Sequence, residues 1–119
     1  MKENIIKTKS FAFALRIIKL YQYLQGEKKE YVLSKQLLRC GTSIGAMVRE
    51  SEQAESKVDF IHKFGIVQKE ANETEYWIEL LYQSEFIEKQ LYDSFYSDIT
   101  EIRKLLTSIL KTLKRRKSN

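Results

Sequence analysis

The sequence of 119 residues contains no proline and only four glycines. Proline is the residue that most often stops a helix, so its absence permits long uninterrupted helices. The chain has a single cysteine, Cys40, and a single histidine, His62. This composition excludes a disulfide framework, a multi-cysteine zinc site and a histidine-rich metal site.

Long apolar runs are also absent. No stretch approaches the ~18 consecutive apolar residues of a membrane span, and the amino terminus lacks the apolar region of a signal peptide. The hydrophobic content of 43% is ordinary for a folded domain, which argues against a disordered chain. We therefore expect one cytoplasmic domain over residues 1–119, with no membrane partner.

Apolar residues recur at alternating steps of about three and four along four segments, and no β-strand alternation persists. This spacing is typical of helices that pack at small crossing angles. The four stripes are Phe13, Ile17, Leu20 and Leu24; Leu33, Leu37, Cys40, Ile44 and Met47; Phe60, Phe64, Val67, Ala71, Thr74, Ile78 and Leu81; and Leu91, Phe95, Ile99, Ile102, Leu106, Ile109 and Leu113.

The stripes predict helices over about 10–25, 32–52, 57–84 and 88–115. The connections are short, so consecutive helices should be antiparallel. The expected fold is all-α, an up-down-up-down four-helix bundle. Ser10 is the expected amino-terminal cap of the first helix, and Gly26 the left-handed residue that ends it. Ser56, three residues before Asp59, resembles a capping box for the third helix.

Charge is distributed unevenly along the chain. Residues 1–49 carry a net charge of +7, residues 50–101 carry −9, and residues 102–119 carry +7 with no acidic residue. Such a chain can pair its charges within the fold or between subunits, or it can present a basic surface to a polyanion such as RNA or DNA. The cations expected to contact phosphate are Lys7, Lys9, Arg16, Lys19, Lys111, Lys114, Arg115 and Arg116.

The basic carboxyl end has a second interpretation, because lysine and arginine near a helix carboxyl terminus interact favourably with the helix dipole. On that interpretation the run is a solvated tail. Phosphate contact would instead be independent of base sequence and strongly weakened by salt. No base-reading motif accompanies the run, so sequence-specific binding is not expected.

The third predicted helix carries acidic and aromatic residues that suit a subunit interface, where aromatic side chains are enriched. The acids are expected to pair with basic residues of the second helix, within one subunit or between two. The expected interface residues are Arg39, Arg49, Glu50, Glu70, Glu73, Tyr76 and Trp77. Apolar burial should dominate, so Trp77→Ala should weaken assembly or folding more than Glu73→Ala.

Glu70 and Glu73 could also bind a metal ion, although a salt-bridged helix face explains them more simply. A di-iron site needs two Glu-x-x-His pairs, and the only comparable spacing here is Asp59 to His62. We assign no catalytic residue, metal ligand or cofactor. Cys40 fits a small buried hydrophobic residue better than a nucleophile.

Gly41 and Gly45 lie four residues apart within the second predicted helix. Each costs about 0.8–1 kcal/mol relative to alanine in a helix interior, so something must offset that cost. Close approach of a neighbouring helix is the simplest compensation. A phosphate-binding loop would need a preceding strand, and none is predicted.

Three stretches together resemble a known family. They are residues 37–46 (LLRCGTSIGA) with Glu50, Ser56 with residues 59–61 (DFI), and residues 69–77 (KEANETEYW). The chain resembles the proteins named for the intervening sequences of bacterial 23S ribosomal RNA genes. Met47 stands where the family usually has an asparagine, so we assign no role to Met47. Ser51 stands where the family usually has alanine or glycine.

The resemblance implies a left-handed antiparallel four-helix bundle that assembles into a homopentameric ring, in a family without an established function. A similar pentameric bundle, the accessory protein of diversity-generating retroelements, binds nucleic acid and a reverse transcriptase. Our first hypothesis is thus a non-enzymatic oligomer that contacts RNA or DNA. The alternatives are a protein-interaction scaffold with no nucleic-acid role and, more weakly supported, a metal-dependent enzyme that uses Glu70 and Glu73.

Overall fold

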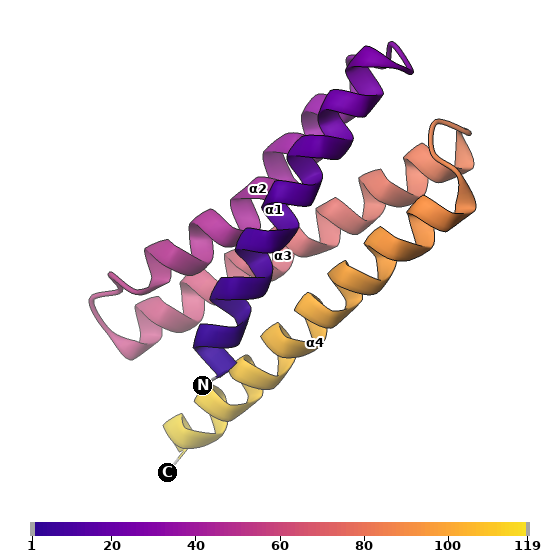
Figure 1. Ribbon diagram of the computed structural model, residues 1–119. Coiled ribbons are helices and arrows are strands. Elements are labelled where there is room, and N and C mark those ends of the chain that lie inside the picture. The colour runs from indigo at the N-terminus through magenta and orange to yellow at the C-terminus, as the bar shows by residue number, and fades with distance from the viewer. Residues whose placement is uncertain (1, 119) are drawn as a thin grey trace.

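The computed structural model describes residues 2–118, except for the side chains of residue 3 and residues 116–118. Four helices account for nearly all of this range: α1 (Lys2–Gly26), α2 (Leu33–Ser51), α3 (Lys57–Gln83) and α4 (Lys89–Ser118). No strand is present in residues 2–118. The predicted all-α four-helix fold is therefore confirmed (Figure 1).

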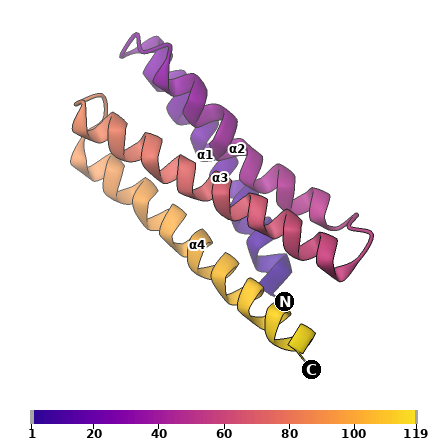
Figure 2. The same ribbon diagram turned by 180° about the vertical axis from the view of Figure 1, so that it is seen from behind.

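Consecutive helices run in opposite directions, so both chain ends lie at the same end of the molecule (Figure 1). The bundle is elongated, with extents of 52 × 23 × 19 Å. Helix α1 packs more extensively against α2 than against α4. The α1–α2 connection accordingly stands away from the α3–α4 connection at the far end of the bundle, as both views show (Figure 2).

The four predicted stripes form the core. Most of their members are buried, and the other five, Leu33, Met47, Phe60, Leu91 and Leu113, pack partly buried at its margin. Phe13 of α1 meets Phe95 of α4 edge-to-face, with ring centroids 6.1 Å apart. This contact joins the first and last helices through the middle of the bundle.

The predicted start of the first helix was wrong, because α1 begins at Lys2 and not at Ser10. Residues 2–9 contain no proline or glycine, and Ile6, fully buried, extends the apolar stripe by about two further turns. Ser10 is therefore not a cap. It is buried in mid-helix, where its hydroxyl donates to the carbonyl of Lys7 at 3.2 Å.

The predicted left-handed conformation of Gly26 is also wrong, because no glycine in the described chain has a positive φ. Lys29 takes that conformation instead, with a φ of 55°. The chain then folds back so that the backbone N–H of Glu30 donates to the carbonyl of Leu24 at 2.9 Å. This places the Glu30 carboxylate against the start of α2, where it accepts hydrogen bonds from three backbone N–H groups.

Helix α3 begins as predicted. The Ser56 hydroxyl accepts a hydrogen bond from the Asp59 N–H at 3.0 Å. The return bond differs from a standard capping box, because the Asp59 carboxylate accepts from the N–H of Glu55 at 3.1 Å, one residue before the cap. Helix α4 continues beyond the predicted residue 115 to Ser118.

The glycines of α2 permit the expected close approach of a neighbouring helix. A Cβ atom at Gly41 would lie 2.9 Å from Cγ1 of Ile17, and one at Gly45 would lie 3.3 Å from the backbone oxygen of Ser10. Both neighbours belong to α1. No helix within residues 2–118 is long and apolar enough to span a bilayer.

Candidate functional site

Five polar and aromatic side chains from α2 and α3 form one network. The Arg39 guanidinium binds the carboxylate of Glu73 and lies 3.5 Å from that of Glu70. Glu70 also accepts a hydrogen bond from the Ser43 hydroxyl at 3.0 Å, and Glu73 accepts one from the indole N–H of Trp77 at 2.9 Å. The predicted pairing of Arg39 with the acids of α3 therefore occurs within one chain.

Of the remaining expected interface residues, Tyr76 lies beside this network, and Arg49 and Glu50 lie in the last turn of α2. Tyr76 is 57% exposed, and its ring packs edge-on against Trp77 at 5.1 Å between centroids. The Arg49 guanidinium lies 4.9 Å from the ring centroid of Phe11 in α1, and Glu50 is exposed. Whether these residues contact a second subunit stays a prediction.

The carboxylates of this network are engaged by other side chains and are poorly suited to bind a metal ion. Both carboxylates already bind a cation or donors from their own chain, and within the described residues no three His, Cys, Asp or Glu side chains are grouped closely enough to hold a metal ion. His62 is exposed on α3. Burial raises the pKa of the Cys40 thiol to about 11, so this cysteine is protonated at neutral pH.

Four cations of α1 were expected to contact phosphate, and three of them already form ion pairs with acidic side chains. Lys7 pairs with Glu52 at 2.9 Å, Lys9 with Glu101 at 3.1 Å, and Arg16 with Asp98 at 2.5 Å. Phosphate contact by these cations would compete with pairs that, being partly exposed, contribute only ~0.2–1 kcal/mol each. The fourth, Lys19, is exposed and has no acidic partner among the described residues.

Helix α4 presents a second basic surface. Lys104, Lys111 and Arg115 lie at steps of seven and four, which places them on one side of the helix. All three are exposed, and none of them has an acidic partner within the described chain. Lys114 is exposed beside them, and the side chain of Arg116 lies outside the described residues. We call Lys104, Lys111 and Arg115 the α4 basic face.

Lys104 was absent from the cations that the sequence singled out. The helical spacing from Lys111 could have identified it, because seven residues are almost two turns. Arg103, the residue directly before Lys104, is directed toward α3 and binds the carboxylate of Glu75. Adjacent cations on one helix therefore have different surroundings, and only the packing of the helices determines which of them is paired.

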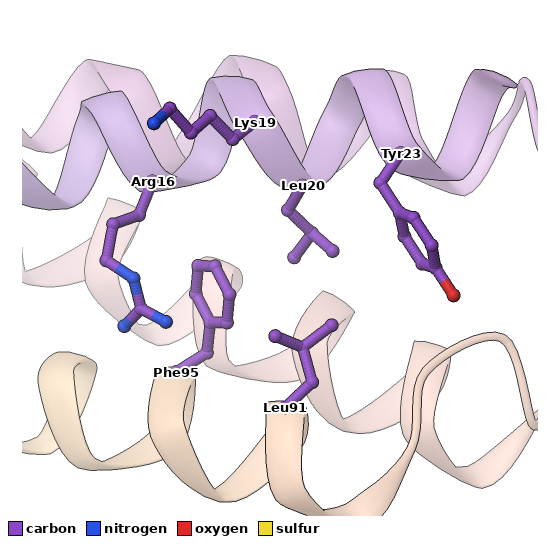
Figure 3. Close-up of a pocket in the computed structure, with 6 residues that line it drawn as sticks. All are labelled: Arg16, Lys19, Leu20, Tyr23, Leu91 and Phe95. Carbon is purple, nitrogen blue, oxygen red and sulfur yellow. The ribbon is translucent and has the colours of Figure 1, made fainter. Parts of the chain in front are cut away.

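An apolar hollow of about 340 Å³ lies between α1 and α4, where the two hairpins diverge. Figure 3 shows Leu20 and Leu91 facing each other across it, beside Phe95. The Arg16 guanidinium covers one end, 4.1 Å from the ring centroid of Phe95, while Lys19 points away from α4. Because Arg16 is held by Asp98 and Ser94, its guanidinium is not free to bind an anion here, and the hollow offers mainly an apolar surface.

The outer side of α1 carries exposed apolar side chains. Phe11, Leu15 and Ile18 recur at steps of four and three, and they are 49%, 50% and 39% exposed. Scattered exposed apolar residues need no explanation, but a row of three on one helix face is typical of an interaction surface. We call these three residues the α1 apolar row.

Comparisons with known proteins agree with this architecture. The family model described as 23S rRNA-intervening sequence protein matches residues 2–108. No curated protein matches. A crystal structure of a protein of unknown function from the S23 ribosomal protein family of Bacteroides thetaiotaomicron is similar, with 58% sequence identity over 93% of this chain and 99% of that one, and a TM-score of 0.92. The chain thus belongs to the 23S rRNA-intervening sequence protein family.

Proposed function

We propose that this protein is a cytoplasmic, non-enzymatic bundle that binds the phosphate backbone of RNA or DNA through the α4 basic face. One observation carries the proposal: Lys104, Lys111 and Arg115 share one side of α4 and are exposed, with no acidic partner in the described part of the chain. In contrast, Lys7, Lys9 and Arg16 are neutralised by acids.

The dimensions suit a polyanion. Lys104 and Arg115 are eleven positions apart, which corresponds to about 16 Å along the helix axis. A nucleic-acid strand presents a phosphate every ~3.4 Å along a duplex axis, so the face spans several phosphates. Binding there would release condensed counterions and would be independent of base sequence.

The test compares two variants with the same change in net charge. Lys104→Gln, Lys111→Gln and Arg115→Gln together should weaken binding to a labelled oligonucleotide. They should also make the salt dependence shallower, by about two in the slope of log K against log salt for single strands. Lys28→Gln, Lys29→Gln and Lys35→Gln, at the far end of the bundle, should change neither property. Equal losses in both triples, or binding that does not respond to salt, would refute the proposal.

A second candidate function, a self-associating scaffold that docks proteins, is favoured by the α1 apolar row. Phe11, Leu15 and Ile18 are exposed on one face of α1, and such an apolar surface lowers solubility unless another protein surface covers it. The family resemblance implies a ring of five copies, and a cyclic assembly needs such a patch to meet a different patch on the next copy. The Arg39–Glu73–Trp77 network, with exposed Tyr76 beside it, is our proposed second patch.

Sedimentation tests this second candidate directly. Leu15→Glu places a charge in the middle of the row and should shift the protein toward the monomer. Gln90→Glu, at an exposed residue near the start of α4 and away from the row, should not. A scaffold without a nucleic-acid role also predicts no salt-dependent oligonucleotide binding by the wild-type assembly. A wild-type monomer at micromolar concentration would exclude self-association through this row.

A further inference from the structure

Tyrosines from α3 and α4 form a ladder that ends at the α4 basic face. The rings of Tyr82 and Tyr92 are stacked with centroids 4.4 Å apart and an interplanar angle of 13°. The ring of Tyr96 follows, 5.6 Å from Tyr92 and tilted by 33°. Tyr82 and Tyr92 are half-buried, but Tyr96 is 41% exposed. The stacked rings of Tyr82 and Tyr92 therefore hold the Tyr96 ring in place while it remains exposed to solvent.

Tyr96 shares a helix side with the basic face. Four-residue steps lead from Tyr96 through Thr100 to Lys104, so these three side chains lie on neighbouring turns of α4. Tyr96, Thr100 and Lys104 line two shallow hollows in common, of about 530 and 330 Å³. The surface thus offers an aromatic ring and a cation about 12 Å apart along the helix axis.

The one acid among the residues that line the two hollows is already paired with a cation. Glu101, which lines the larger hollow, binds Lys9 at 3.1 Å. Arg103, which lines the smaller hollow, binds Glu75. Lys104 has no such partner in residues 2–118, so the cation beside Tyr96 is available to an external anion.

We propose that Tyr96 is a stacking platform for an unpaired base, so that this surface binds single-stranded nucleic acid in preference to duplex. This inference rests on the proposed binding of phosphate by the α4 basic face. A base face is accessible for stacking in a single strand and is covered by its neighbours in a duplex. Proteins that bind single strands without sequence preference combine stacking aromatics with a basic track along the backbone. Tyr96 followed by Lys104, Lys111 and Arg115 has this arrangement.

The experiment measures binding of labelled oligopyrimidines of about 12 nucleotides, as RNA and as DNA, and of a duplex of the same length, by fluorescence anisotropy. Wild type should bind both single strands more tightly than the duplex. Tyr96→Leu should lose about fivefold or more in affinity for the single strands and little for the duplex. Tyr96→Phe and Tyr96→Trp should retain single-strand affinity, because both keep a stacking ring.

Tyr31→Leu is the matched control, because Tyr31 is also exposed, at 50%, but lies in the α1–α2 connection away from α4. It should change neither affinity. Thermal melting of every variant identifies losses that come from unfolding, and the affinity retained by Tyr96→Phe shows that the ring, not the hydroxyl, makes the contact.

The outcomes separate this inference from the proposed function. Suppose that the triple variant with glutamine at Lys104, Lys111 and Arg115 loses binding, while Tyr96→Leu binds single strands like wild type. The proposed stacking on Tyr96 is then wrong, and the proposed phosphate binding stands. Equal wild-type affinity for single strand and duplex overturns the inference in the same way. If wild type binds neither oligonucleotide in a salt-dependent manner, both proposals fail.

Discussion

Gly41 of α2 faces Ile17 of α1 so closely that a methyl group at residue 41 would lie 2.9 Å from Ile17 Cγ1. Ile17 is fully buried and branched at Cβ, so its side chain has little freedom to move aside. The contact explains why glycine occupies the interior of a helix. It also fixes the separation of α1 and α2 along the middle of the bundle.

Gly41→Ala should therefore lower the free energy of unfolding, even though alanine favours a helix. Overpacking costs about 1–3 kcal/mol, which exceeds the gain in helix propensity of about 0.8–1 kcal/mol. Gly65→Ala in α3 is the control, because a Cβ there would meet no atom within 4 Å apart from its chain neighbours and the backbone of its own helix. It should raise stability. Urea denaturation of both variants measures the difference, and changes of the same sign would show that the contact is not restrictive.

Trp77→Ala should destabilise the protein more than Glu73→Ala. The indole packs half-buried against the core, so its loss should cost about 2–3 kcal/mol, below the full value for a buried tryptophan. Loss of the Glu73 carboxylate removes a partly exposed ion pair and one hydrogen bond, about 1 kcal/mol. Trp77 is the only tryptophan, so melting should be followed by circular dichroism. The reverse order would indicate that the network matters more than the apolar contact.

Acidification should destabilise the start of α2. Burial alone would raise the pKa of Glu30, but hydrogen bonds from the N–H groups of Leu33, Ser34 and Val32 outweigh it and hold the pKa below the usual 4.5. A lowered pKa means that the carboxylate contributes stability above pH 4.5, and that this contribution is lost as the pH falls further.

Glu30→Gln should accordingly lower stability at pH 7 by about 0.5–2 kcal/mol, as for loss of a helix cap. The difference between wild type and variant should narrow as the pH falls below 4.5. Glu27→Gln, an exposed residue in the same connection, is the control and should leave the pH dependence unchanged. A constant difference at all pH values would contradict the assigned role of the charge.

Cys40 should resist alkylation in the native protein. Its side chain is fully buried and its pKa is raised to about 11, so at pH 8 the reactive thiolate is scarce and inaccessible. Labelling with iodoacetamide should proceed only as the protein unfolds, with a rate that rises through the urea transition. Rapid modification without denaturant would show that α2 opens locally.

Local rules explain most of what could be predicted about the fold. The stripes of α1 to α4 and the Ser56 cap depend on residues within one or two turns, so spacing alone identified them. The first helix was predicted to start too late, because Ser10 has the chemistry of a cap. The buried Ile6, four residues earlier, shows that the stripe continues.

The α4 surface could be predicted only in part. The absence of acids after residue 101 correctly indicated a basic carboxyl-terminal segment. Lys104 was missed, and Tyr96 was not singled out, because its exposure depends on where α3 places Tyr82 and on the orientation of α4. The sequence alone does not show which tyrosine of a helix is exposed and which is partly buried.

The sequence by itself determined that this chain forms four amphipathic helices, because hydrophobic periodicity is a property of residues three and four apart. Only the tertiary structure decided which charges are free. Arg16 and its partner Asp98 are separated by 82 residues, and no local pattern reveals that α1 and α4 bring them together. The pairing of charges depends on helix orientation in the bundle. The candidate surface on α4 could therefore be recognised only once the structure showed that Lys7, Lys9 and Arg16 of α1 are paired with acids.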